Sequence, residues 1–312
     1  MTELLGEVLA GRFRVEQEML RVGARSIYRA TDLVEDRELA VEIPHASVAR
    51  SSAEYQVWHR ALSMLDHAGV VRIHAIGLSA AGRPYVARDA HPGRSLKDVV
   101  ENGGPLPAER VASIACDVLS ALVHAHRIPV AGGLLHLDVR TASVFLLDAA
   151  QSQPAHARLN FGHGGVVADA GAPIGLPLRP TTHGPEFATP VFSSPEQKRS
   201  AIAPVNGLAV DDRSDVYSVG AIAFTALTAR LHLGEERLDV HTATRAYYDQ
   251  PMPSVRDVLP SAPRNLASFI DRCLAVDPED RWPSAVDALE AVESARRPSL
   301  VDRLRVGLRR RR

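Results

Sequence analysis

The sequence predicts an α+β protein with two lobes, a small β-rich lobe followed by a larger helical lobe. Polar and hydrophobic residues alternate over residues 11–44, which is typical of an antiparallel meander. Beyond residue 107, hydrophobic residues instead recur every three or four positions, as on amphipathic helices. The length of 312 residues suits two domains or one large bilobal unit. We therefore place the lobes at residues 1–90 and 91–295 and a tail at residues 296–312.

Strands dominate the first lobe. The meander contains the runs Phe13–Val15, Ser26–Tyr28 and Leu39–Ile43. A helix should follow, because Ser51 and Glu54 form a capping box and hydrophobic residues then recur at helical spacing. These hydrophobic residues are Tyr55, Trp58, Leu62 and Leu65. Two further short strands fit Val70–Ile76 and Pro84–Ala87.

Helices dominate the second lobe. Pro107 opens the first of them, and its hydrophobic stripe consists of Val111, Ile114, Val118 and Leu122. Three more helices fit Asp215–Leu227, Asn265–Leu274 and Ser284–Ala295. Five prolines and three glycines between residues 171 and 190 predict a long loop.

The composition excludes several classes of protein. Lys plus Arg is 36 and Asp plus Glu is 37, so a net charge of -1 gives no general attraction for nucleic acid. The two cysteines, Cys116 and Cys273, are too few for a disulfide framework and favour a reducing compartment. Neither a signal peptide nor a membrane-spanning stretch is evident. We therefore expect a cytoplasmic protein that does not bind nucleic acid.

Five motifs occur in the order found in bacterial Ser/Thr protein kinases. His136–Ser143 (HLDVRTAS) resembles the catalytic loop, and Asn160-Phe161-Gly162 resembles the metal-binding DFG triplet. Thr189–Gln197 (TPVFSSPEQ) resembles the end of the activation segment, while Asp212–Gly220 and Asp277–Arg281 are similar to two later landmarks. The resemblance covers residues 11–295 and implies the bilobal protein-kinase-like fold.

The resemblance also implies a phosphoryl-transfer site, and this sequence departs from it. The family holds the phosphates with a glycine-rich loop and with a strand Lys that a helix Glu supports. The glycine positions fall at Leu20, Val22 and Arg25, with Gly23 the one glycine near by. In the strand Leu39–Ile43, which includes Ala40, the Lys position is Glu42. The helix Glu position is Trp58, which lies on the hydrophobic stripe of its helix and should fill the core.

The metal-binding positions have changed as well. Asn160 stands where the family has the DFG Asp, and Ser143 stands at the catalytic-loop Asn. Because Mg²⁺ prefers carboxylate oxygen, we expect no metal site and lost or weak binding of ATP and Mg²⁺. Asp138 remains at the position of the proton acceptor, with Arg140 in place of the usual Lys. Without a metal or held phosphates, Asp138 is expected to be vestigial.

The size of these changes favours inactivity over weak activity. Two unit charges about 4 Å apart interact by about 4 kcal/mol at an effective dielectric of about 20. Glu42 in place of Lys thus turns attraction for phosphate into a repulsion of similar size, and about 1.4 kcal/mol already changes a rate tenfold. The resemblance therefore implies a pseudokinase that acts as a regulatory or scaffold protein through protein–protein interaction.

Two other functions stay open. One is an atypical or weak Ser/Thr kinase that uses Asp138 and holds phosphate with Arg21 and Arg25. The other is a sensor that binds a nucleotide or another ligand without metal and without turnover. Metal-dependent thermal stabilisation by nucleotide would favour the first, and metal-independent stabilisation would favour the second.

Other family positions are retained in roles that hold the fold. In the family, the Glu196 position pairs with the Arg281 position, and the Asp215 position supports the catalytic-loop backbone. The remaining structural positions are His136, Phe161 and Gly162.

Two charged features lie outside the family pattern. Arg88 falls at a position behind the nucleotide site that is normally neutral and close to the strand Lys, so we expect Arg88 and Glu42 to pair and block the cleft. The tail at residues 296–312 carries eight Arg and one Asp. It is expected to attach the protein weakly to an anionic membrane surface or to an acidic protein.

Overall fold

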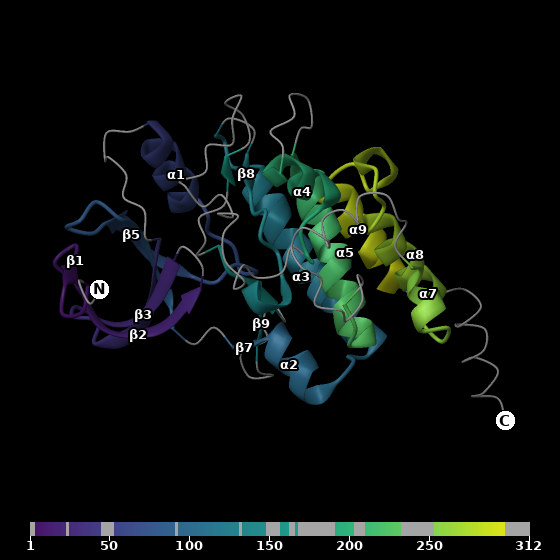
Figure 1. Cartoon of the computed structure of the whole chain (residues 1–312), viewed down its shortest axis with the longest axis horizontal. Coiled ribbons are helices and arrows are strands. Elements are labelled where there is room, and N and C mark those ends of the chain that lie inside the picture. The colour runs from purple at the N-terminus through teal and green to yellow at the C-terminus, as the bar shows by residue number, and fades with distance from the viewer. Residues whose placement is uncertain are drawn as a thin grey trace.

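The computed structural model describes residues 4–22, 25–44, 53–90, 93–130, 133–147, 157–161, 166–167, 191–202, 210–231 and 253–296. A sheet with one helix lies at one end of the molecule, and the remaining helices form the larger part beside it (Figure 1). The expected order of a β-rich lobe followed by a helical lobe is confirmed. These parts are called the N-lobe and the C-lobe below.

The N-lobe is built on a six-stranded antiparallel sheet with the order β1-β2-β3-β4-β6-β5. Its strands are β1 (Val8–Leu9), β2 (Phe13–Val22), β3 (Arg25–Asp32), β4 (Arg37–Pro44), β5 (Ile73–Leu78) and β6 (Pro84–Asp89). Between β4 and β6, Ala40 lies opposite Arg88 and Glu42 lies opposite Val86. Residues two apart on a strand share a face of the sheet. Arg88 and Glu42 are therefore diagonal neighbours on the same face.

The alternating sequence of the meander explains its core. Phe13, Val15, Tyr28, Val41 and Ile43 are all buried in one cluster under the sheet. Helix α1 (Ala53–Ser63) packs its hydrophobic stripe into the larger core that continues into the C-lobe. The expected helix is thus confirmed, although its proposed capping box at Ser51 and Glu54 lies outside the side chains that the structure describes.

Four long helices form the body of the C-lobe. They are α3 (Ala108–His126), α5 (Asp212–Thr228), α8 (Arg264–Cys273) and α9 (Ala285–Arg296), each beginning within three residues of its predicted start. Every residue of α5 from Ser214 to Leu227 is buried, because neighbouring helices surround it. Gly220 permits the closest of these contacts, since a Cβ added there would lie 2.5 Å from Cβ of Cys273.

Several short elements of the structure are absent from the sequence prediction. Three are helices, namely α2 (Leu96–Gly103), α4 (Pro195–Ile202) and α7 (Val255–Val258). The others are β7 (Arg94–Ser95), β8 (Leu134–Leu135), β9 (Val144–Leu146), β10 (Ala157–Leu159), β11 (Val166–Val167) and the 3₁₀ turns Thr141–Ser143 and Pro278–Asp280. Strands of two or three residues do not show the alternation that marks longer ones.

Some sequence expectations cannot be compared with the structure. The predicted loop at 171–190 and the tail beyond Arg296 lie outside the described residues. Helix α9 includes Arg296, one residue beyond the boundary placed at 295. In the described part of the chain, no helix has the length and hydrophobicity required to cross a membrane.

Candidate functional site

A buried ion pair occupies the N-lobe side of the boundary between the lobes. Nε of Arg88 donates a hydrogen bond of 2.7 Å to Oε1 of Glu42, and the second guanidinium contact is also 2.7 Å. The side chains are 6% and 1% exposed, so both charges are withdrawn from water. The expected pairing of these two residues is confirmed. A buried pair of this kind is tolerated because each charge satisfies the other.

The C-lobe supplies the third member of this cluster. Nδ2 of Asn160 donates to Oε1 of Glu42 over 3.0 Å. Arg88 makes two further contacts, donating to the carbonyl oxygen of Asp89 over 2.9 Å and lying 5.9 Å from the ring centre of Phe145 on β9. Glu42 therefore accepts hydrogen bonds from both lobes, and the Arg88 guanidinium contacts Glu42 of β4 and lies over the ring of Phe145 of β9.

The neighbouring Ser143 is used by the loop that carries it. Its Oγ donates to the carbonyl oxygens of Arg140 (2.9 Å) and Asp138 (3.2 Å) and accepts from the backbone N–H of Arg140. Ser143 is 1% exposed and Asn160 is 4% exposed. Neither provides a carboxylate, and both side chains are engaged within the protein. This donor set does not fit Mg²⁺, which prefers carboxylate oxygens and water.

Asp138 and Arg140 lie together closer to solvent. Nε of Arg140 is 3.4 Å from Oδ1 of Asp138, and the two side chains are 15% and 39% exposed. Asp138 is thus partly exposed, and its carboxylate faces the guanidinium of Arg140. In the described part of the chain, no cluster of three or more His, Cys, Asp or Glu could hold a metal ion.

His136 fixes the start of this loop against the segment that carries Asn160. Its Nε2 lies 2.9 Å from the carbonyl oxygen of Asn160, while its Nδ1 accepts from the backbone N–H of Asp138 over 3.1 Å. These two contacts require the neutral tautomer protonated at Nε2. Burial lowers the pKa of His136 and favours the same neutral form. The ring also packs edge-on against buried Phe161 at 4.5 Å.

Asp215 organises the loop from helix α5. Its carboxylate accepts backbone hydrogen bonds from His136 (2.8 Å) and Leu137 (2.7 Å) and lies 2.9 Å from Nε2 of His126. Burial acts to raise the pKa of Asp215, but His126 and these hydrogen bonds outweigh it and hold the pKa below its usual value. Leu137 adopts a left-handed φ of 56°, a strained backbone conformation that these bonds maintain.

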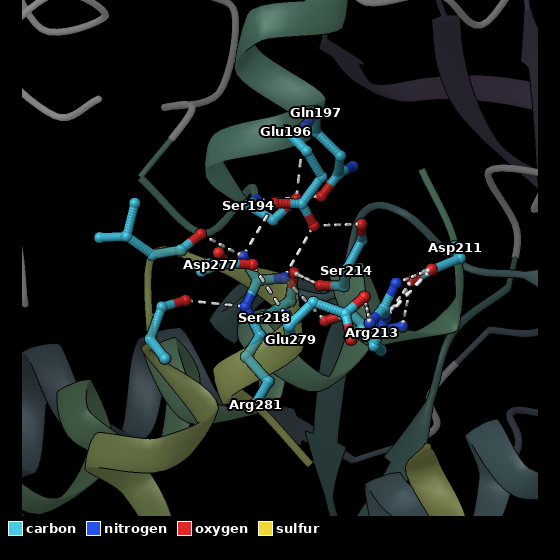
Figure 2. A network of polar contacts seen from close by, with 12 residues as sticks. Ser194, Glu196, Gln197, Asp211, Arg213, Ser214, Ser218, Asp277, Glu279 and Arg281 are labelled. Atoms are coloured by element: carbon cyan, nitrogen blue, oxygen red, sulfur yellow. Dashed lines mark hydrogen bonds and ion pairs between the residues drawn. The ribbon is translucent and has the colours of Figure 1, made fainter. Parts of the chain in front are cut away.

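A second buried pair anchors α4 to the start of the last helical segment. Arg281 contacts both carboxylate oxygens of Glu196, at 2.7 and 2.8 Å, and Ser214 also donates to Glu196 (Figure 2). Arg281 is fully buried, and its remaining donors reach backbone carbonyls, including that of Ala275 at 2.8 Å. Burial acts to raise the pKa of Glu196, but Arg281 overcomes this and holds it at about 2. The family pairing expected for these positions is therefore present.

The remaining predicted residues are spread over the N-lobe. Trp58 is 3% exposed and lies in the core, as expected, while Ala40 is buried on β4 and Leu20 is half exposed on β2. The guanidinium of Arg21 makes a bidentate contact with the carboxylate of Glu18, at 2.8 and 2.9 Å. This contact weakens the suggestion that Arg21 binds phosphate. Gly23, Gly162 and the side chains of Val22 and Arg25 lie outside the described residues.

Comparison with known proteins settles the family. The profile described as Protein kinase domain matches residues 23–292, which is most of the chain. This chain belongs to the protein kinase family. Among curated relatives, the Ser/Thr protein kinase Pkn1 of Myxococcus xanthus is 30% identical over 97% of this chain and 40% of its own length. The Ser/Thr protein kinase PrkC of Bacillus subtilis is 25% identical over 94% of this chain and 42% of its own length.

The solved structures agree on the fold. The kinase domain of PknI from Mycobacterium tuberculosis has a TM-score of 0.62 and 20% identity, covering 94% of this chain and 99% of that domain. This likeness confirms the bilobal kinase fold. The chain spans less than half the length of the two curated kinases named above.

Sequence reasoning missed several residues of this kinase-family cleft. Arg158 on β10 lies 3.7 Å from Asp89, and Nε2 of His74 lies 2.7 Å from the same carboxylate. Arg37 in turn donates to Nδ1 of His74 over 2.8 Å. These residues come from four separate strands, so spacing along the sequence gave no sign that they meet. The sequence showed altered charges at Glu42, Arg88 and Asn160, but it did not show these contacts of Asp89.

Proposed function

We propose that this kinase-family domain is catalytically inactive and works as a regulatory or scaffold protein through contacts with other proteins. The observation that supports it most is the cluster of Glu42, Arg88 and Asn160. At the position where the family holds phosphate with Lys, this chain has a carboxylate that is already paired. The folding contacts of the family are kept, while the groups for phosphoryl transfer are replaced.

We propose as well that ATP and Mg²⁺ bind weakly or are not bound. Arg88 is held in a buried pair with Glu42 and lies over Phe145 of β9, and we expect nucleotide entry to break this pair. Removing one partner from a buried ion pair costs about 3–5 kcal/mol, which would subtract from any binding energy of the nucleotide. The neutral Asn160 and Ser143 offer no compensating charge for a metal.

The test is transfer of radiolabelled phosphate from ATP, with Mg²⁺ or Mn²⁺, to the protein itself and to a generic basic protein. We expect no labelling above that of Asp138→Ala, the matched variant at the position of the proton acceptor. Restoring Lys at position 42 alone should not create activity, since the metal ligands remain absent. Labelling that disappears in Asp138→Ala would overturn the proposal and favour an active Ser/Thr kinase.

Thermal-shift measurements with nucleotides separate the other alternative. Stabilisation without metal would identify a ligand sensor, whereas an unchanged melting temperature with and without Mg²⁺ agrees with a scaffold. The Arg88→Met variant is the informative comparison. It removes the guanidinium that pairs with Glu42 and lies over Phe145, so a nucleotide shift found in this variant and absent in the wild type would show that Arg88 excludes the ligand.

A further inference from the structure

Three consecutive residues of the C-lobe each bind the N-lobe. Arg158 and Leu159 are the last two residues of β10, Asn160 follows them, and β10 itself pairs with β9 in the C-lobe. Arg158 reaches Asp89 at 3.7 Å. Leu159 donates its N–H to the carbonyl of Gly69 at 2.7 Å and accepts from the N–H of Val71 at 2.9 Å. We call these three residues the clasp.

The third contact of the clasp is the most buried one. Asn160 donates to Glu42 in the sheet of the N-lobe, while its own backbone N–H donates to the carbonyl of Ser143 in the C-lobe over 2.9 Å. Arg88 strengthens the same junction from the other side, because it pairs with Glu42 and lies over Phe145 of β9. Opening the lobes would separate the carboxylate of Glu42 from the amide of Asn160. Loss of this hydrogen bond costs free energy because both groups are buried in a low-dielectric interior.

We infer that the clasp holds the two lobes in one fixed arrangement without any ligand. Closure of a two-lobed enzyme commonly depends on a ligand that bridges the lobes. Here Arg88 and Asn160 take that bridging role within the chain itself. The protein therefore presents one constant surface to a partner, whether or not nucleotide is available. This inference concerns the arrangement of the lobes and does not depend on the absence of catalysis.

The distance between two spin labels tests the clasp. Val34 in the turn between β3 and β4 is 73% exposed, and Asn102 on α2 is exposed in the C-lobe, so both accept a label after substitution by Cys. The two native cysteines are buried, and single-label samples check that they stay unmodified. We expect one narrow distance distribution that Mg²⁺-ATP does not shift. A broad or double distribution in the wild type, or a peak that moves with Mg²⁺-ATP, overturns the inference.

Variants of the clasp give the matching comparison. Arg158→Gln combined with Asn160→Ala should widen the distance distribution about twofold or more, because two of the contacts that cross the boundary are removed. Arg158→Gln alone, at a side chain that is 30% exposed, provides a folded variant if the double variant is unstable and should widen the distribution to a smaller extent. Arg14→Gln, which removes an ion pair within the N-lobe, is the control and should change nothing.

If the folded clasp variants keep the narrow distribution of the wild type, the clasp is not what holds the lobes. The outcome is separable from that of the phosphate-transfer assay. An active protein with one fixed distance would overturn the proposed function alone. An inactive protein with a broad distribution would overturn the clasp alone.

Discussion

At the scale of single residues, three residues that differ from the usual kinase residues contact one another through Glu42. Glu42 in place of Lys would leave a buried negative charge, but Arg88 and Asn160 both donate to it. The carboxylate of Glu42 thus accounts for both the Arg88 and the Asn160 side chain. Changing one of the three residues toward the usual kinase residue is therefore expected to destabilise the fold.

A double-mutant cycle measures that dependence. Glu42→Gln and Arg88→Met should each lower the free energy of unfolding by about 3 kcal/mol, because each leaves a buried polar partner unsatisfied. The double variant should lose less than the sum, with a coupling energy of about 2 kcal/mol in urea unfolding. A coupling near zero would mean that the pair does not act as a unit.

Lys198 provides a second test at this scale, through pH. Burial lowers its pKa to about 7, although the charge of Glu196 opposes the shift. Above this value the folded protein has lost a proton that the unfolded chain still binds, so stability should rise with pH by up to about 1.4 kcal/mol per unit. Below about pH 7 both states are protonated and the slope from Lys198 disappears.

The measurement is urea unfolding between about pH 7 and 7.8, below the pKa of about 8.5 that cysteine has in an unfolded chain. Burial also raises the pKa of Cys273, and that group would act in the opposite direction at higher pH. Lys198→Met should flatten the rise in stability. An equal slope in both proteins would show that Lys198 is not buried in solution.

At the scale of elements, charged side chains hold α4 in place. The Glu196–Arg281 pair joins the first turn of α4 to the segment that leads into α9. Arg281→Lys should lower the free energy of unfolding by about 3 kcal/mol or more, because Lys cannot reproduce the two parallel bonds and the backbone contacts of the guanidinium.

Arg213→Lys is the control for this prediction in the same network (Figure 2). Arg213 binds Asp211 and the exposed Glu279, so its replacement should cost less than about 1 kcal/mol. Chemical denaturation of both variants measures the loss in the free energy of unfolding for each. Equal losses would contradict the distinction between the buried and the surface pair.

The same scale shows what the sequence could predict. The helices α3 and α8 carry clear periodicity and the meander carries clear alternation, whereas α5 is a largely apolar run buried on all sides from Ser214 to Leu227; all of these elements lie close to where the sequence predicts them. The pairing of Glu42 with Arg88 was predicted because two unusual charges fell at neighbouring family positions. The part played by Asn160 was not, since the bond depends on how the lobes meet. Asp89 and Arg158 were missed for the same reason.

At the scale of the whole molecule, charge is concentrated at one end of the chain. We propose that the basic tail attaches the protein weakly to anionic membranes or acidic partners, each Arg contributing at most about 1 kcal/mol near such a surface. Ending the chain after Arg296, which contacts Cys116 in α3, should leave the melting temperature nearly unchanged and abolish binding to anionic vesicles. Full-length protein that ignores such vesicles at low salt would rule out this attachment.

The scarcity of lysine has a practical consequence for labelling this molecule. Lys97, on α2, has a side chain 52% exposed, whereas Lys198 is 5% exposed, and the sequence contains no other lysine. Amine-reactive reagents acylate neutral, accessible amines, so among side chains the folded protein offers them a single attachment point. Immobilisation through Lys97 would orient all molecules alike on a sensor chip. Acylation of Lys198 would then show that α4 had opened in that molecule.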